Sequence, residues 1–286
     1  MGKLKTKMEE EMALRGLRPR SQKSYLYAVR KFVEHYGRSP RTLGQREVRA
    51  YLIYLLKDRQ LSDSTVNQAL HALKFFYRHV LERGEVVEDL VVKRQRRRKL
   101  PVILTREEVE RILSATEGLL YQTLFMTLYA TGLRLGEGRR LRVEDIDREA
   151  MRICVRDGKG GQDRAVMLSP RLLYHLETYW WRCRPRPWLF ARPGADQPIA
   201  TRSAQRAFQR SVAAAGIEKK VSAHSLRHAF ATHLLEQGTS LLYIQQLLGH
   251  RNLTSTMIYT RLTETQTSGV RSPFDTLIGE APERFW

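Results

Sequence analysis

Apolar residues recur at helical spacing along the first part of the chain and predict a bundle of amphipathic helices. The pattern runs over residues 21–36, 42–56 and 62–81, where apolar side chains return every three or four positions. Arg and Lys occupy the intervening positions, as they do on the solvent side of a helix that buries its other face. We therefore expect about four helices with a basic surface in this part of the chain.

The rest of the chain mixes helices with a short β-hairpin. Thr105, followed three residues later by Glu108, predicts a helix start with a capping box. Alternating apolar residues at 151–155 and 165–168, on either side of a glycine-rich turn, predict two hairpin strands. Further helices are expected at 119–130, 170–182, 201–215, 224–237, 240–248 and 253–262, with Tyr243 in the core. The predicted fold class is mainly α with a small β-sheet (α+β).

The charge balance narrows the class of partner. The 286 residues include 50 Lys+Arg and 30 Asp+Glu, which gives a formal net charge of +20. Such an excess favours a polyanionic partner, with nucleic acid first and an anionic membrane surface second. No apolar run is long enough for a spanning helix, and no apolar segment follows the basic N-terminus as in a secretory signal. Cys154 and Cys183 make neither a disulfide framework nor a zinc site, so a cytoplasmic, DNA-binding protein is expected.

The positive charge is densest at the end of the first segment. Residues 1–98 carry a net charge of +12, and residues 99–286 carry +8. A run of like charges cannot pack into a core and stays extended. We predict an interdomain linker at 93–101 that contacts DNA phosphates, with a solvated loop of no further role as the alternative. The basic residues of this linker are Lys93, Arg94, Arg96, Arg97, Arg98 and Lys99.

The second segment contains residues that suit chemistry on a phosphodiester. His224 and Arg227 share a helix face, and an arginine fork matches two phosphate oxygens. A tyrosine hydroxyl can act as nucleophile, while lysine and histidine can transfer protons. Since no carboxylate pair accompanies them, a two-metal site is not indicated. A zinc site at His224, His228 and His233 lacks an acidic or cysteine partner, so the last two are expected to pack rather than react.

Several motifs in order resemble the tyrosine recombinases of the phage-integrase and Xer type, over about residues 15–277. They are Ala130-Thr-Gly-Leu-Arg134, His224-Ser-Leu-Arg227-His228, Leu248-Gly-His250 and Met257-Ile-Tyr259. The resemblance implies a site-specific recombinase or integrase that cleaves and rejoins DNA through a 3′-phosphotyrosyl link, with no cofactor, metal or ATP. It implies that Arg134 and Arg227 clamp the scissile phosphate and that Tyr259 is the nucleophile. It also implies that Lys159 protonates the leaving hydroxyl and that His224 and His250 transfer protons. Glu137 is expected to support the site or to be simply structural.

The resemblance also implies a domain plan. A helical, SAM-like core-binding domain is expected at 10–92, the linker at 93–101, a catalytic domain at 102–270 and a tail at 271–286 that contacts a neighbouring protomer. The family clamps double-stranded DNA and exchanges strands as a homotetramer, with two protomers per site. Accessory DNA-bending or directionality proteins are further partners of this kind of enzyme.

A narrower likeness concerns the substrate. Glu137-Gly138 and the stretch 269–277 are similar to integron integrases, yet those enzymes carry an insertion where this chain runs only from Trp180 to Trp188. We therefore expect duplex rather than folded single-stranded sites. Trp180 and Trp181 are expected in the core or at an interface, with base stacking as the alternative.

Two other functions are compatible with some of these sequence features. A type IB topoisomerase would share the chemistry, but the separate basic helical domain and the recombinase-like tail speak against it. A non-catalytic DNA-binding protein would not need all six of the expected catalytic residues.

Overall fold

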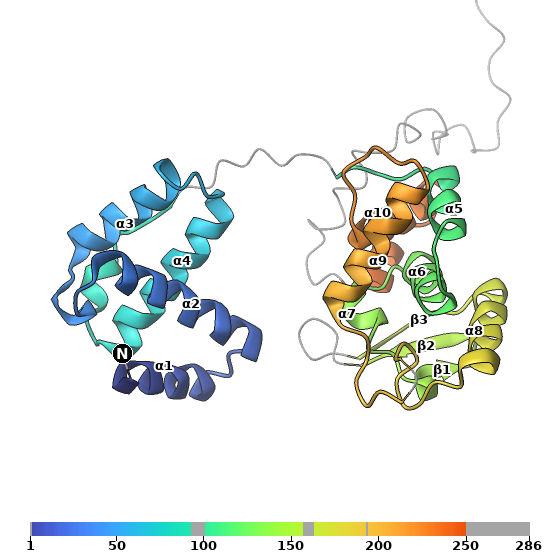
Figure 1. Ribbon diagram of the computed structural model, residues 1–286, viewed down its shortest axis with the longest axis horizontal. Helices are drawn as coiled ribbons and strands as arrows, with labels where there is room; N and C mark the ends of the chain where they lie inside the picture. The colour runs from blue at the N-terminus through green and yellow to red at the C-terminus, as the bar shows by residue number, and fades with distance from the viewer. Residues whose placement is uncertain (1, 93–100, 157–162, 193, 250–286) are drawn as a thin grey trace, which may run out of the picture. The chain divides into compact units, whose positions relative to one another are not determined.

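The chain forms two compact units, residues 1–98 and 99–286. The computed structural model describes residues 2–92, 101–156, 163–192 and 194–249 (Figure 1). The basic linker at 93–99, Lys159, His250, Tyr259, the expected helix at 253–262 and the tail lie outside the described residues. No helix of the described part is both long and apolar enough to cross a membrane.

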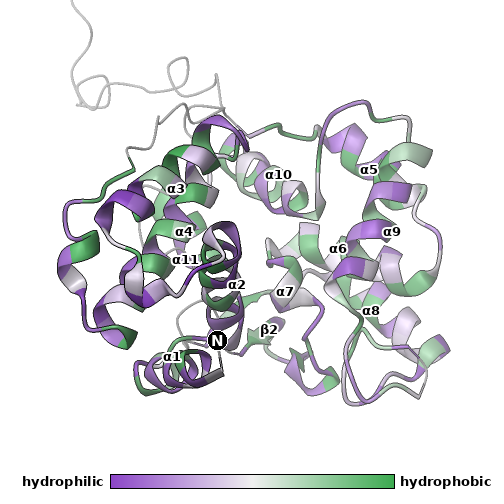
Figure 2. Ribbon diagram, turned by 60° about the vertical axis from the view of Figure 1, so that its left-hand side comes forward, coloured by the Kyte–Doolittle hydropathy of each residue, from purple (hydrophilic) through white to green (hydrophobic). Residues whose placement is uncertain are grey.

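The first unit is helical throughout its described length. Its helices are α1 (Gly2–Leu14), α2 (Pro19–Tyr36), α3 (Gln45–Lys57) and α4 (Asp63–Phe75), and α4 continues as a π-helical segment (Phe76–Val80). Short 3₁₀ turns lie at Pro40–Thr42 and Gly84–Val87. Hydrophilic and hydrophobic stretches alternate along these helices (Figure 2), as the sequence pattern predicts.

An aromatic cluster forms the centre of this first core. The ring of Phe32 meets the rings of Tyr51 and Tyr77 edge to face, with centroids 5.2 and 6.3 Å apart. Helix α1, which the hydrophobic pattern did not predict, adds the buried side chains of Met8 and Met12 to this core. A domain boundary at residue 10 therefore falls inside a helix that packs with the rest of the unit.

The second unit packs helices around a small sheet. The helices are α5 (Arg106–Ser114), α6 (Leu119–Thr131), α7 (Leu135–Gly138), α8 (Pro170–Cys183), α9 (Thr201–Ala214), α10 (Ala223–Glu236) and α11 (Leu241–Leu248). In the described part, antiparallel strands β1 (Ile146–Asp147), β2 (Arg152–Val155) and β3 (Arg164–Met167) form one sheet in that order. Ile153 lies opposite Ile146 on one side and Val166 on the other. The sheet is the predicted hairpin with a two-residue strand added at its edge.

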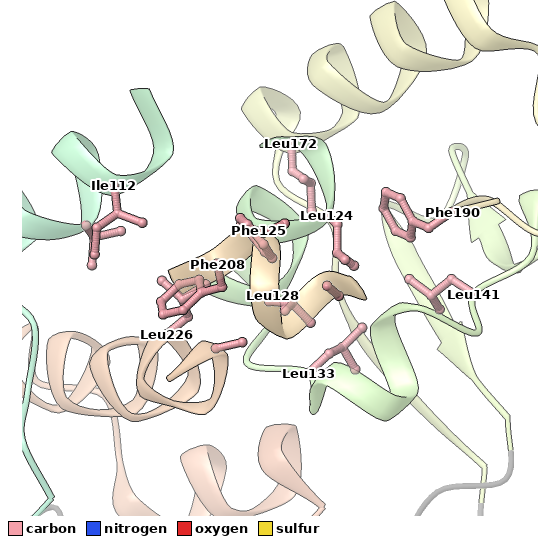
Figure 3. Close-up of a cluster of buried hydrophobic side chains, with 14 of the residues drawn as sticks. Ile112, Leu124, Phe125, Leu128, Leu133, Leu141, Leu172, Phe190, Phe208 and Leu226 are labelled. Atoms are coloured by element: carbon pink, nitrogen blue, oxygen red, sulfur yellow. The ribbon is translucent and has the colours of Figure 1, made fainter. Parts of the chain in front are cut away.

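Helix α6 lies at the centre of the second core. Leu124, Phe125 and Leu128 are fully buried, and the Phe125 ring meets the Phe208 ring of α9 at 90° with centroids 5.3 Å apart (Figure 3). The predicted capping box starts α5, because the Thr105 amide donates to the Glu108 carboxylate at 2.8 Å and the Glu108 amide donates to the Thr105 hydroxyl. A short sequence signal is thus enough to set where α5 begins.

One burial prediction is wrong. Tyr243 is 51% exposed, because the buried face of α11 is formed by Ile244, Leu247 and Leu248, which pack on α10. Trp181 is 66% exposed, which leaves an interface or base stacking, and not the core, among the places predicted for it.

Candidate active site

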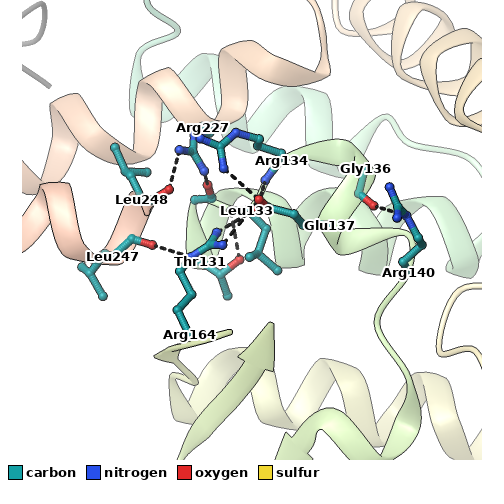
Figure 4. Close-up of polar contacts among 11 residues, drawn as sticks. Thr131, Leu133, Arg134, Gly136, Glu137, Arg140, Arg164, Arg227, Leu247 and Leu248 are labelled. Atoms are coloured by element: carbon teal, nitrogen blue, oxygen red, sulfur yellow. Dashed lines mark hydrogen bonds and ion pairs between the residues drawn. The ribbon is translucent and has the colours of Figure 1, made fainter. Parts of the chain in front are cut away.

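Arg227 on α10 is a fully buried cation that joins three helices. The residue is 1% exposed, and its guanidinium donates to the carbonyl oxygens of Gly132 and Leu248, each at 2.7 Å (Figure 4). These carbonyls lie at the C-terminal ends of α6 and α11, where helix carbonyls lack partners within the helix and carry partial negative charge. Both contacts help to offset the cost of burying the charge.

Arg134 is held close to Arg227 by a carboxylate on the next helix. It stands directly before α7, its amide donates to Glu137 Oε2 at 3.0 Å, and its Nη1 donates to Glu137 Oε1 at 2.8 Å. The side chain of Arg134 is 25% exposed, whereas that of Glu137 is 10% exposed. The carboxylate therefore fixes a guanidinium that still faces solvent.

Arg164 is a third arginine in this place, and no sequence motif indicated it. It extends from β3, and its Nη2 donates to Glu137 Oε2 at 2.8 Å while its Nε donates to the Leu247 carbonyl at 3.3 Å. Burial alone would raise the pKa of Glu137, but hydrogen bonds from Arg164 and Arg134 outweigh it and lower this pKa to about 2. Because the partners lie 27 positions apart in sequence, no local spacing could have revealed the contact.

Close packing explains two of the glycines in the motif boxes. Gly132 and Gly249 end α6 and α11 with φ of +65° and +61°, a conformation that glycine adopts without strain. A Cβ on Gly132 would lie 2.4 Å from the Phe230 ring, and a Cβ on Gly249 would lie 3.1 Å from Arg164. The glycines thus let Phe230 and Arg164 approach the helix ends whose carbonyls Arg227 binds.

Three histidines of α10 sit in different surroundings. Desolvation lowers the pKa of His224, and the nearby charges of Arg227 and Arg134 lower it further. The His228 ring lies 4.7 Å from that of His224, and desolvation lowers the pKa of His228 to about 4. His233 is buried with Nδ1 2.9 Å from the Tyr129 hydroxyl, and desolvation also lowers its pKa. His233 therefore has a structural hydrogen bond to Tyr129 of α6.

The described part of the structure brings Arg134, Glu137, His224 and Arg227 to one place. The geometry cannot place Lys159, His250 and Tyr259, which lie outside the described residues. Leu248, whose carbonyl Arg227 binds, is two positions before His250 in the chain. The guanidinium groups of Arg134 and Arg227 and the imidazole of His224 form a site for an anion with several oxygen atoms, such as a phosphodiester.

Family models and similar proteins identify the family of this chain. The model described as phage integrase family matches residues 103–266, and that described as phage integrase, N-terminal SAM-like domain, matches residues 4–84. The putative integrase/recombinase y4qK of Sinorhizobium fredii is 39% identical over 282 residues, which span 99% of this chain and 92% of that protein. The tyrosine recombinase XerA of Pyrococcus horikoshii is 32% identical over 255 residues, which span 88% and 86%.

Solved structures share the fold. The crystal structure of XerA recombinase aligns with a TM-score of 0.52 at 28% identity, covering 92% of this chain and 94% of that chain. The XerH recombinase bound to palindromic difH substrate aligns with a TM-score of 0.72 at 21% identity, covering 91% and 82%. The chain belongs to the phage integrase family of tyrosine recombinases, which are site-specific DNA recombinases. The resemblance, the fold class and the enzyme class predicted from the sequence are confirmed.

The histidines predict how stability depends on pH. Their pKa values are lower in the folded protein than in the unfolded chain, where histidine titrates near about 6.5. As the pH falls below that value, the unfolded chain binds protons that the folded state excludes, down to about pH 4 for His228. We expect the free energy of unfolding to fall between about pH 7 and about pH 5, by at most about 1.4 kcal/mol per pH unit for one histidine.

Urea unfolding at several pH values measures this slope. His228→Gln is expected to flatten it, while His71→Gln, at an exposed position of α4, leaves it unchanged. An equal slope in both variants would contradict the assignment.

Gly249→Ala tests the close approach of Arg164. The left-handed backbone costs an alanine about 1–2 kcal/mol, and the new methyl group also displaces Arg164. Gly238→Ala is the matched control, since Gly238 has φ of +83° with nothing within 4 Å of the added Cβ. Urea unfolding should show a larger loss of stability for Gly249→Ala than for Gly238→Ala, and equal losses would show that backbone strain alone accounts for the effect.

Proposed function

We propose that this recombinase cleaves one DNA strand by attack of the Tyr259 hydroxyl on the scissile phosphorus. A bond forms between the tyrosine oxygen and phosphorus, the bond to the 5′-oxygen breaks, and Lys159 protonates that oxygen as it leaves. Arg134 and Arg227 stabilise the negative charge of the phosphoryl group, and His224 and His250 hydrogen-bond it and accept the tyrosine proton. The 3′-phosphotyrosyl link keeps the phosphodiester energy, so rejoining to a 5′-hydroxyl requires no metal or ATP.

The observation that carries this proposal is the meeting of arginines from distant parts of the chain. Arg227 binds the carbonyl of Gly132, which is 95 positions away in sequence and two residues before Arg134. A buried guanidinium so close to a part-exposed one supports a preorganised anion site, because neither cation has to move when charge develops on the phosphate. Glu137 is the supporting carboxylate that fixes Arg134.

We infer that the first unit, which includes α1, is the core-binding domain expected at 10–92 and that it contacts the DNA backbone. A groove of about 730 Å³ lies among α2, α3 and α4. Its cations are Arg20, Lys23, Lys31 and Arg59, against the single carboxylate of Glu34. Tyr27 and Tyr54 also line it, so ring faces lie beside the cations. Such a surface suits phosphates, whose counterions are released when the cations bind.

The remaining domain assignments belong to the same proposal. The basic residues at 93–101 contact phosphates as a linker, 102–270 is the catalytic domain, and the tail at 271–286 binds a neighbouring protomer. A homotetramer, with two protomers on each duplex site, supplies the four active sites of strand exchange. One solved structure of the same fold is a lambda integrase tetramer bound to a Holliday junction, which supports this assembly. We propose action in the cytoplasm, with accessory DNA-bending or directionality proteins as further partners.

Covalent trapping tests the nucleophile. Wild-type protein incubated with fragmented genomic DNA and then denatured is expected to leave DNA linked to the chain, and sequencing that DNA identifies the target site. A nicked suicide substrate of the recovered sequence then gives a quantitative assay. Tyr259→Phe is expected to abolish the adduct, because phenylalanine lacks the hydroxyl that attacks the phosphorus. Tyr243→Phe, which changes an exposed tyrosine of α11, is the control. An undiminished adduct from Tyr259→Phe would exclude this nucleophile, and specific binding without any adduct would indicate a non-catalytic protein.

Salt dependence tests the groove of the first unit. Lys23→Glu combined with Arg59→Glu is expected to weaken duplex binding and to reduce the slope of log affinity against log salt by about 0.9 for each phosphate that the variant no longer neutralises. Arg49→Glu combined with Lys57→Glu is the matched control, because it changes the charge by the same amount at two exposed positions outside the groove. Equal slopes for the groove variant and wild type, measured by fluorescence anisotropy, would place the DNA elsewhere.

A further inference from the structure

Arg164 holds a position that none of the motif boxes explains. It lies on β3, outside the boxes that contain Arg134, His224, Arg227 and His250. Its side chain is only 14% exposed, yet it ends in the middle of the candidate active site (Figure 4). We propose that Arg164 is a positioning residue that keeps the charge of Arg134 available to the scissile phosphate, an inference that rests on the proposed function.

The first step of the argument is the sharing of one carboxylate. Glu137 lies between two guanidinium groups and accepts from Arg134 Nη1 at 2.8 Å and from Arg164 Nη2 at 2.8 Å (Figure 4). An arginine paired with one carboxylate forms a neutral unit, whose field at a nearby phosphate is weak. With Arg164 added, the three groups carry a net charge of +1. Because the carboxylate is largely buried, water screens this difference poorly.

The second step concerns the direction of the Arg134 side chain. Arg164 donates to both oxygens of Glu137, through Nη2 to Oε2 at 2.8 Å and through Nη1 to Oε1 at 3.4 Å. The Arg134 amide also donates to Oε2, and the Arg134 guanidinium donates through Nη1 to Oε1. Arg164 thus makes the two-pronged pair with the carboxylate that Arg134 would otherwise make. The guanidinium of Arg134 is held by one hydrogen bond to the carboxylate, and the Arg134 side chain stays 25% exposed.

The third step is the link to other catalytic segments. Arg164 Nε donates to the Leu247 carbonyl at 3.3 Å, and its side chain lies against Gly249, the residue before His250. In sequence, Arg164 follows Lys159 by five residues. One side chain therefore connects the strand after Lys159, the carboxylate that holds Arg134 and the helix end before His250.

Adduct formation on two substrates tests the proposal. One is the suicide duplex, and the other replaces a non-bridging oxygen of the scissile phosphate with a methyl group, which removes its negative charge. On the first substrate, Arg164→Gln is expected to slow adduct formation roughly ten- to hundredfold, with duplex affinity changed by less than about twofold. On the uncharged substrate the loss should shrink to less than about threefold, because the charge that Arg134 meets is gone.

Three further variants separate charge from fold. Arg164→Lys keeps the charge and should recover part of the rate. Glu137→Gln combined with Arg164→Gln restores the net charge of +1 and should be faster than Arg164→Gln alone. Arg140→Gln is the matched control, since Arg140 is an exposed neighbour on the same side of the unit that binds Gly136 and not Glu137. Its rate should equal that of wild type on both substrates.

The outcomes are distinct. Equal losses for Arg164→Gln on the two substrates, or a double variant slower than the single one, would overturn the proposal and leave Arg164 as a purely structural residue. If Arg164→Gln does not fold, the comparison of Arg164→Lys with the double variant on both substrates decides in the same way. Failure of wild-type protein to form any adduct would instead overturn the proposed function.

Discussion

The burial of the Arg227 guanidinium is the constraint on which the rest of the site depends. A buried charge is tolerated only where hydrogen bonds replace its water, and here two helix ends supply the carbonyls of Gly132 and Leu248. Those carbonyls are available because glycines end both helices in the left-handed conformation. The same contacts fix the chain just before Arg134 and just before His250.

The cations of this protein fall into classes that differ in exposure. Most Lys and Arg side chains of the described residues are exposed, as suits binding to a phosphate backbone without regard to sequence. Arg227, Arg164 and Arg134 form a graded series from fully buried to part-exposed. Glu137 joins Arg164 to Arg134, and its low pKa keeps it charged over the whole physiological range.

Local patterns predicted the elements well where one face of a helix is apolar, as in α2, α4 and α9. These patterns did not predict a helix whose few apolar residues lie among many charged ones. Helix α1 buries only Met8 and Met12 among many Lys and Glu, so its pattern is faint. The burial predicted for Tyr243 was wrong for the opposite reason. Helix α11 has apolar residues on more than one face, and only contact with α10 decides which face is buried.

The sequence by itself determined most of the helices, the hairpin, the family and the expected motif residues Arg134, His224 and Arg227, because spacing over a few positions and the order of motifs carry that information. Only the tertiary structure decided which charges meet. Arg164 reaches Glu137 across 27 positions and Arg227 reaches Gly132 across 95. A contact over such a separation depends on how β3, α7 and α10 pack around α6, and packing of distant segments leaves no periodic trace in a single chain.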